Sequence, residues 1–445
     1  MIRKSLAAAA AFGALSWASV DAAQAQSNPI YVPLGPANGA LYKPDSGPAP
    51  HVGLIVMHRT SNYIRHPACT EMSKRGFMVL CVNTRFDNNE SQVIFEQIPL
   101  DVKAAMTYLR QQPGITKVVL FGHSGGGPTM SLYEAVAENG VGYCKGPNKL
   151  VECGDELAGL QPADGIVFAD AHPSNAMLTL RGLNPSVPDE SNPPTAKIAD
   201  LDPFDVKNGF NPNGNSKYSA DFQKRYYEGQ SARMNRLIVL AQAKLAAIKS
   251  GAYPYTDDDI MIVPRGGPSG PGAGASAYLY QTDPSIDYIT ATVRPAKLLK
   301  NDGTVKSDAV VHSVAKGDPS LAKRHVTYID GTRTLTVKSF LSANAVRSKN
   351  SLDDIDVCSS NNSTICAVQQ INIPIMFAAM GAYYFVGDNE RMFDLAKTKD
   401  KDFVVIEGAT HGFTPCIPCG PTPDAYANSV KNLFDYAAAW INKRF

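Results

Sequence analysis

The chain has 445 residues, a net charge of +1 at neutral pH and 19% charged residues. This balance gives no reason to expect a nucleic acid or an anionic membrane surface as a partner. No apolar run after the N-terminal segment is long enough to cross a bilayer, so we also expect no membrane span.

The first residues have the pattern of a secretory signal peptide. Arg3 and Lys4 precede an Ala-rich apolar run from Leu6 to about Val20, and Ala23-Gln24-Ala25 follows as a small-x-small cleavage signal. The alternative is a retained anchor, but the run is shorter than the ~20 apolar residues of a span. We therefore expect residues 1–25 to be removed and the mature protein to be periplasmic or secreted.

An even number of cysteines in an oxidising compartment favours disulfides. The chain has eight: Cys69, Cys81, Cys144, Cys153, Cys358, Cys366, Cys416 and Cys419. Closeness in sequence suggests Cys144–Cys153, Cys358–Cys366 and Cys416–Cys419, although the sequence does not define the connectivity. Cys416-x-x-Cys419 could also be a redox pair or half of a zinc site, but no second ligand pair matches it.

The N-terminal third alternates strand-like and helix-like segments. Residues 30–34 and 40–42 flank a Gly/Pro-rich turn and predict a hairpin. Continuous apolar runs, typical of buried parallel strands, span 52–57, 78–82, 117–121 and 166–169, and helical spacing marks 100–111 and 129–138. This alternation predicts the α/β class with a doubly wound, mostly parallel sheet.

The C-terminal part, residues 371–445, resumes this texture with strands expected at 373–379 and 403–406 and a closing helix at 425–442. The middle differs. It begins with a Pro-, Asn- and Ser-rich segment (173–215), and a long helical pattern (220–249) follows.

A Gly/Pro-rich loop (266–274) and polar strand candidates (326–329 and 334–340) complete the middle part. We therefore expect a core of residues 26–172 and 371–445, interrupted by a large cap-like insertion of residues 173–370.

The central motif is Gly122-His123-Ser124-Gly125-Gly126, a G-x-S-x-G sequence directly after an expected strand and before an expected helix. This context identifies a nucleophile elbow, in which a sharp turn exposes the Ser hydroxyl above a helix N-terminus. The residues two before and two after the Ser must be small, and both are glycine. The alternative is a Gly-rich turn with a surface Ser.

With this motif, residues 30–172 and 371–445 resemble the α/β-hydrolase superfamily, whose triad follows the chain order Ser, acid, His. The resemblance implies Ser124 as nucleophile and a His after the last strand as base. His411 has that place, in the segment Glu407-Gly-Ala-Thr-His411-Gly-Phe, and a neutral imidazole suits a base near pH 7. His172, after another core strand, is the fallback base.

The acid that orients the base has two candidates. The usual position in the family, after the strand preceding the His strand, points to Asp388, which could instead cap a helix. Asp170, at the end of the strand at 166–169, is the second candidate, a position that some lipase-like members use. The sequence favours Asp388, with Asp170 as the fallback, although a triad is finally defined by geometry.

The oxyanion hole is expected to use two backbone N–H groups. One belongs to Gly125, the residue after the nucleophile, and the other to Thr60 or Arg59, in the loop after the strand at 52–57. The family often has His-Gly in that loop, whereas this chain has His58-Arg59. Arg59 could also contact an acidic substrate group, point to solvent or pair with a carboxylate.

These residues predict a serine hydrolase that cleaves a small or polymeric carboxylic ester through an acyl-enzyme, without metal or organic cofactor. The same triad could serve an amidase, a peptidase, a C–C bond hydrolase or an acyltransferase, because the fold does not fix the bond that is cleaved. A non-catalytic binding protein on a hydrolase scaffold is the rival from another class.

Overall fold

The computed structural model describes residues 28–190, 197–254, 256–264, 279–286, 289–315 and 333–445. The expected signal peptide (1–25), the Gly/Pro-rich loop (266–274) and the strand candidate at 326–329 lie outside these ranges. None of the helices in the described ranges is both long enough and apolar enough to cross a bilayer.

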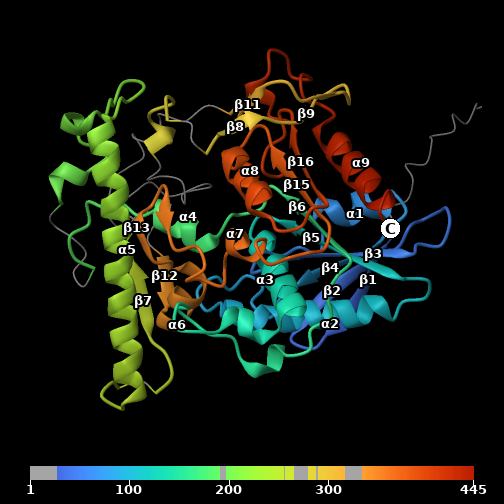
Figure 1. Cartoon of the computed structure of the whole chain (residues 1–445), viewed down its shortest axis with the longest axis horizontal. Coiled ribbons are helices and arrows are strands. Elements are labelled where there is room, and N and C mark those ends of the chain that lie inside the picture. Colours follow the sequence, from blue (N-terminus) through green and yellow to red (C-terminus); the bar gives the residue numbers. More distant parts are fainter. Residues whose placement is uncertain (1–27, 191–196, 255, 265–278, 287–288, 316–332) are drawn as a thin grey trace, which may run out of the picture.

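A ten-stranded sheet with the order β1-β2-β4-β3-β5-β6-β15-β16-β9-β10 forms the centre of the molecule (Figure 1). All neighbouring pairs from β4 to β9 are parallel, and the remaining pairs are antiparallel. The strands are β1 Ile30–Leu34, β2 Ala37–Tyr42, β3 Val52–His58, β4 Met78–Asn83, β5 Lys117–His123, β6 Gly165–Ala169, β9 Leu298–Leu299, β10 Val305–Lys306, β15 Ile375–Met380 and β16 Lys401–Ile406. The α/β class and the mostly parallel sheet predicted from the sequence are confirmed.

Helices cover both faces of this sheet, which explains the continuous apolar runs of its strands. In β3, Ile55 and Met57 face the core side of α2 and α3, whereas Leu54 and Val56 face that of α1 and α9. The helices around the sheet are α1 Pro67–Ser73, η1 Phe95–Gln97, α2 Ile98–Arg110, α3 Gly126–Asn139, η2 Val141–Cys144, η3 Asp155–Leu157, α8 Val386–Leu395, η10 Ile417–Cys419 and α9 Ser429–Asn442.

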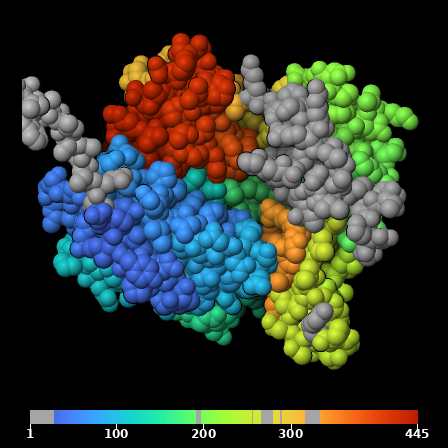
Figure 2. All heavy atoms as spheres, turned by 180° about the vertical axis from the view of Figure 1, so that it is seen from behind, coloured from blue at the N-terminus to red at the C-terminus, as the bar shows by residue number. Residues whose placement is uncertain are grey.

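The N-terminal part of the described chain lies beside its C-terminal part. In Figure 2 the blue N-terminal surface adjoins the red C-terminal surface, in keeping with an ion pair between Arg75, just after α1, and Asp435 of α9 (Nη2–Oδ1 2.7 Å). The C-terminal helix therefore closes the face of the sheet that the first helix begins to cover.

The middle of the chain has an apolar core of its own. Helix α5 runs along one side of the molecule beside β7, β12 and β13 (Figure 1). Its residues Met234, Leu237 and Ala241 belong to that core. The elements of this part are α4 Asn175–Arg181, η4 Ala199–Leu201, η5 Val206–Asn208, α5 Ala220–Lys249, β7 Ile260–Val263, η7 Leu279–Gln281, β8 Ala291–Pro295, β11 Val310–His312, β12 Arg333–Thr336, α6 Val337–Ser339, the π-helix η9 Phe340–Asn344, β13 Ser348–Asn350, β14 Asp354–Ile355 and α7 Thr364–Ala367.

The middle part differs from expectation in two places. Strands β9 and β10 lie within residues 173–370, yet they extend the central sheet because β9 pairs in parallel with β16. The strand expected at 334–340 ends at Thr336, whose hydroxyl accepts the N–H of Ser339 and starts the helical turn α6. The insertion is thus not wholly separate from the core, and its boundaries stay a prediction.

All eight cysteines are paired. The three pairs predicted from closeness in sequence are present, and the remaining pair is Cys69–Cys81, which links α1 to β4. The Cα atoms of the four pairs are 5.2–6.1 Å apart, a normal separation for disulfides. Cys416–Cys419 closes a short loop near His411.

A buried carboxyl group joins the core to the middle part. The carboxyl of Glu96 in η1 accepts hydrogen bonds from Ser342 Oγ in η9 (2.5 Å) and from Asn361 Nδ2 (3.1 Å). Burial raises the pKa of Glu96 from its ordinary value near 4.5 to about 7, while those hydrogen bonds and the nearby Lys149 act in the opposite direction.

The raised pKa of Glu96 predicts that the free energy of unfolding falls as the pH rises. The folded state holds the Glu96 proton more tightly than the unfolded state, so its contribution is complete below about pH 4.5 and is lost as the pH rises through 7. We expect wild type to lose on the order of 3 kcal/mol across that range relative to Glu96→Gln, because one pKa unit corresponds to about 1.4 kcal/mol. Urea unfolding of both proteins at several pH values, with disulfides intact, measures the difference. Parallel pH profiles would contradict the prediction.

Candidate active site

The nucleophile elbow has the local geometry that its sequence requires. Strand β5 ends at His123, helix α3 begins at Gly126, and Ser124 lies between them with a left-handed φ of 56°. A Cβ on Gly122 would come within 2.9 Å of the carbonyl oxygen of Gly126, and one on Gly126 would collide with the carbonyl oxygen of Met57. Both glycines are therefore needed for the turn.

Ser124 is in contact with His411. The Oγ atom of Ser124 lies 2.9 Å from Nε2 of His411, which follows β16 in the loop that the sequence indicated. On the other side of the ring, Nδ1 lies 2.6 Å from Oδ2 of Asp170. Ser124 is 9% exposed and the His411 side chain 25% exposed, so both keep some contact with solvent.

Asp170 is held firmly at the end of β6. Its N–H donates to the carbonyl of Ala378 (2.7 Å), and its Oδ1 accepts the N–H of Met380 (3.1 Å), both in β15. Burial raises the pKa of Asp170, and the hydrogen bond and charge of His411 act in the opposite direction. The Asp170 carboxyl is thus fixed against the imidazole by the neighbouring strand.

Asp388, the first choice for the acid from the sequence, does not contact His411. It lies in the first turn of α8, and its carboxylate binds Nη1 of Arg181 in α4 at 2.9 and 3.1 Å. Both side chains are buried. The expectation is corrected because the turn after β15 leads Asp388 toward the middle part of the chain, where it joins α4 to α8.

A second imidazole lies within hydrogen-bond distance of Ser124. Nε2 of His172 lies 2.9 Å from Ser124 Oγ, and Nδ1 of the same ring lies 2.5 Å from Oδ1 of Asn175. The sequence indicated His172 only as a fallback for His411. Asn175 gave no signal of its own apart from standing three residues after a His that follows a core strand.

The loop after β3 presents side chains rather than the expected backbone donor. The N–H of Thr60 is directed to Nδ1 of His58 (3.1 Å), and Nδ1 also accepts the N–H of Ser61 (2.8 Å). Thr60 therefore does not direct its N–H toward Ser124, contrary to expectation. Because Nδ1 of His58 accepts, its proton is on Nε2, and burial, with Arg59 nearby, lowers the pKa of His58 so that the ring stays neutral.

The guanidinium of Arg59 forms an ion pair through one edge only. Its Nε and Nη2 bind Oε1 of Glu90 at 3.2 and 2.5 Å, whereas Nη1 is buried and has no hydrogen-bond partner among the described residues. A Cβ placed on Gly125 would collide with Arg59 Nη1 and would lie 2.6 Å from His58 Nε2. Two side-chain donors therefore stand beside Gly125.

A chain of neutral histidines fixes the backbone of the His411 loop. The N–H of Ala68 is directed to Nδ1 of His66, His66 Nε2 lies 2.9 Å from His123 Nδ1, and His123 Nε2 lies 2.8 Å from the carbonyl oxygen of His411. Burial lowers the pKa of His66 to about 3 and that of His123 well below its ordinary value. Each ring can thus donate from Nε2, and the chain anchors the loop of His411.

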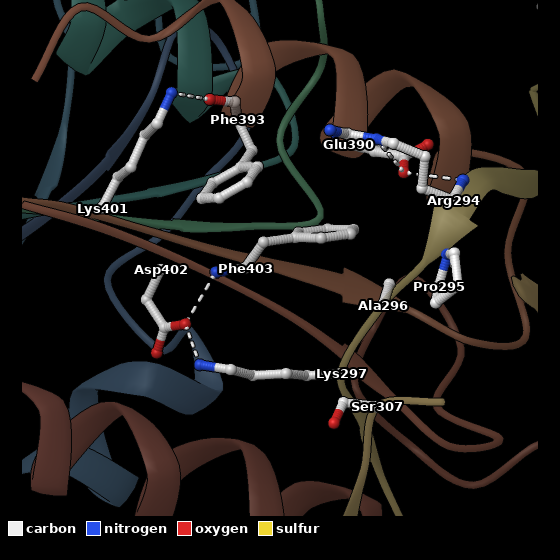
Figure 3. A pocket seen from close by; sticks show the side chains of 10 residues that line it. All are labelled: Arg294, Pro295, Ala296, Lys297, Ser307, Glu390, Phe393, Lys401, Asp402 and Phe403. Carbon is white, nitrogen blue, oxygen red and sulfur yellow. Dashed lines mark hydrogen bonds and ion pairs between the residues drawn. The ribbon is translucent and has the colours of Figure 1, made fainter. Parts of the chain in front are cut away.

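The pocket in Figure 3 is separate from these residues. It encloses about 340 Å³ between β8, β16 and α8. Lys297 Nζ there lies 2.5 Å from Asp402 Oδ1, and Lys401 Nζ donates to the carbonyl oxygen of Phe393 (2.6 Å). Among its lining residues Ser307 is the only one with a hydroxyl, and there is no histidine or cysteine. Within the described ranges, no three His, Cys, Asp or Glu side chains form a group that could hold a metal ion.

The strand order, the left-handed Ser124 between a strand and a helix, and its contact with a His after a later strand together define the architecture. The chain has the α/β-hydrolase fold. No protein-family model and no curated protein sequence matches it.

Three solved structures are among those similar to the chain. Est1E from Butyrivibrio proteoclasticus is 9% identical, with 94% of this chain and 99% of that chain covered and a TM-score of 0.39. Brefeldin A esterase, a bacterial homologue of human hormone sensitive lipase, is 11% identical (94% and 77% covered, TM-score 0.40). Dienelactone hydrolase from Anabaena variabilis is 11% identical (94% and 97% covered, TM-score 0.36).

Proposed function

We propose that the protein is a secreted serine hydrolase that cleaves carboxylic esters, with Ser124 as nucleophile, His411 as general base and Asp170 as the acid that orients it. One observation carries the proposal: the continuous contact from Ser124 Oγ to His411 Nε2 (2.9 Å) and from His411 Nδ1 to Asp170 Oδ2 (2.6 Å). Each group is within hydrogen-bond reach of the next, as the proton transfer requires.

The reaction follows from this order of groups. Ser124 Oγ attacks the ester carbonyl while Nε2 of His411 takes its proton, and Asp170 stabilises the imidazolium that forms. The tetrahedral intermediate expels the alcohol, which takes the proton from His411. Water, deprotonated by His411, then attacks the acyl-enzyme and releases the acid and Ser124.

The developing oxyanion has three candidate donors. The Gly125 N–H stands at the N-terminus of α3, and His58 Nε2 and Arg59 Nη1 point to the space beside it. A buried guanidinium donor without a partner gains most from a negative oxygen, because charge-assisted hydrogen bonds are the strongest. Arg59 thus acts through its side chain, not through the backbone N–H expected from the sequence.

Aromatic side chains pack against the two imidazoles beside Ser124. Tyr383 stacks on His411 (ring centroids 4.4 Å apart), and Phe385 meets both His411 and His172 edge-on. Phe385 is fully buried and supports the two imidazoles, whereas the partly exposed Tyr383 offers apolar surface beside His411, which suits an acyl or aryl group.

The test is hydrolysis of short- and long-chain p-nitrophenyl esters by the purified mature protein and by Ser124→Ala. We expect turnover by wild type and its loss in the variant, while a fluorophosphonate probe labels wild type alone. Labelling without ester turnover would direct the search to amides, C–C bonds or acceptor alcohols. A folded wild type that neither turns over nor labels would contradict the proposal and favour a binding protein.

A further inference from the structure

The position of His172 is fixed by its own backbone. Its N–H donates to the carbonyl of Ser124 (2.9 Å), and its carbonyl accepts the hydroxyl of Thr364 (2.7 Å). Its ring lies nearly parallel to that of His411, with the centroids 6.0 Å apart and 17° between the planes. Ser124 Oγ therefore stands within 2.9 Å of two imidazole nitrogens, one from each ring.

The protons at Ser124 decide how the two rings differ. A carboxylate only accepts, so the Nδ1 of His411 that faces Asp170 carries a proton, and its Nε2 accepts the hydroxyl proton of Ser124. Ser124 has no second proton to give. For its contact with Ser124 to be a hydrogen bond, His172 must donate from Nε2 to Oγ.

Asn175 provides the matching partner on the other side of His172. Its Oδ1 faces Nδ1 of the ring, while its Nδ2 is buried without a partner among the described residues. Exchanging the two amide atoms, which differ little in size, turns an N–H toward Nδ1. The ring, kept neutral because burial, with His411 and Arg59 nearby, lowers its pKa, then accepts at Nδ1 and donates at Nε2.

These relations give one directed chain of hydrogen bonds, from Asn175 through His172 and Ser124 to His411 and Asp170. We propose that His172 is a second catalytic residue, which donates its Nε2 proton in a hydrogen bond to Ser124 Oγ and thereby assists the departure of Oγ from the acyl-enzyme. The role rests on the proposed acyl-enzyme mechanism.

The chemistry is asymmetric between the two halves of the reaction. In deacylation, water adds to the acyl carbon as His411 takes its proton, the C–Oγ bond breaks, and Oγ receives that proton back from His411. A donor on Oγ stabilises the negative charge that develops as this bond breaks. In acylation Oγ is the attacking atom, and the same hydrogen bond does not favour its attack.

Imidazole nitrogen NMR tests the donor directly in the whole protein, without any substrate. With ¹⁵N-labelled histidine, we expect the proton of His172 on Nε2 and that of His411 on Nδ1. The His172→Gln variant assigns the signal by its disappearance. A proton on Nδ1 of His172 would overturn the proposal, whether or not the protein hydrolyses esters.

Burst kinetics with a p-nitrophenyl ester test the catalytic role. His172→Met removes the donor and should lower the deacylation rate about 10- to 100-fold, the effect of one hydrogen bond to a charged group. The burst that reports acylation should change much less, so acyl-enzyme accumulates. His172→Gln, whose amide N–H can replace Nε2–H, should keep most of the deacylation rate.

Asn175→Asp tests the direction of the hydrogen bonds along this chain. An aspartate has nearly the same shape but only accepts, so it forces the His172 proton onto Nδ1 and should slow deacylation as His172→Met does. Unchanged deacylation in Asn175→Asp, or an equal fall of acylation and deacylation in His172→Met, would refute the assisting role. Absence of any turnover or fluorophosphonate labelling in wild type would instead refute the proposed function.

Discussion

Asp170→Asn is expected to lower kcat by about 10⁴-fold, since an asparagine can hold the base of a triad in the wrong tautomer without disturbing the fold. KM should change little, because Asp170 is buried behind His411 and does not reach a substrate. Steady-state hydrolysis of p-nitrophenyl esters by wild type and variant gives both constants.

Asp388→Asn is the matched control, because Asp388 was the acid favoured by the sequence. It should retain kcat within a few-fold but lose stability, since Arg181 then keeps a buried charge with a weaker partner. Breaking such a pair costs about 3–5 kcal/mol. If the variant does not fold, Arg181→Met combined with Asp388→Leu removes both charges. A folded Asp388 variant without activity, beside an active Asp170→Asn, would reverse the assignment.

Arg59→Met should lower kcat by about 10²- to 10³-fold, the typical loss when one oxyanion donor is removed. The reason is the position of Arg59 Nη1 beside Gly125, buried and without a partner among the described residues until an oxyanion forms. A thionoester, whose sulfur is a poor acceptor, should be affected much less than the matching ester. An equal loss for both substrates would contradict an oxyanion role for Arg59.

Glu90→Gln distinguishes the contribution of the Arg59 donor from that of the Glu90 charge that holds it. Burial acts to raise the pKa of Glu90, but the charge of Arg59 and the hydrogen bond from Thr60 lower it to about 2, so the pair is ionised. In Glu90→Gln the charge is lost, but the amide oxygen can still accept hydrogen bonds from Arg59 and hold its guanidinium in place. We therefore expect a loss several-fold smaller than that of Arg59→Met, measured with the same pair of substrates.

Much of the fold could be predicted because the central strands β3, β4, β5 and β6 are buried on both faces. Four apolar runs and the helical spacing of α2 and α5 indicated their elements to within a few residues, and α5 begins and ends where its periodicity does. Strands β9 and β10 gave no such signal. Two residues each are too short for a pattern, and their strand pairing with β16 is set by tertiary structure.

The site could be predicted only where a local pattern defines it. Ser124 and His411 stand in motifs of their own, and the structure places them in contact. Whether Asp170 or Asp388 approaches His411 depends on where the chain turns after β15, which spacing does not reveal. The orientations of Arg59 and Asn175 depend on partners far away in sequence or on a choice between two amide atoms.

Strand β15 is synthesised long after β6, its neighbour in the sheet, and this order affects folding during biosynthesis. Strand β6 lies inside the finished sheet, between β5 and β15, but Ile375 is synthesised only after the whole middle part of the chain. Until then β6 has an open edge, and unpaired strand edges are where nascent chains associate wrongly. We therefore expect slow folding after translation, as non-local strand pairing requires. Until β15 and the His411 loop have docked, a newly made chain holds Ser124, the proposed nucleophile, apart from its proposed base.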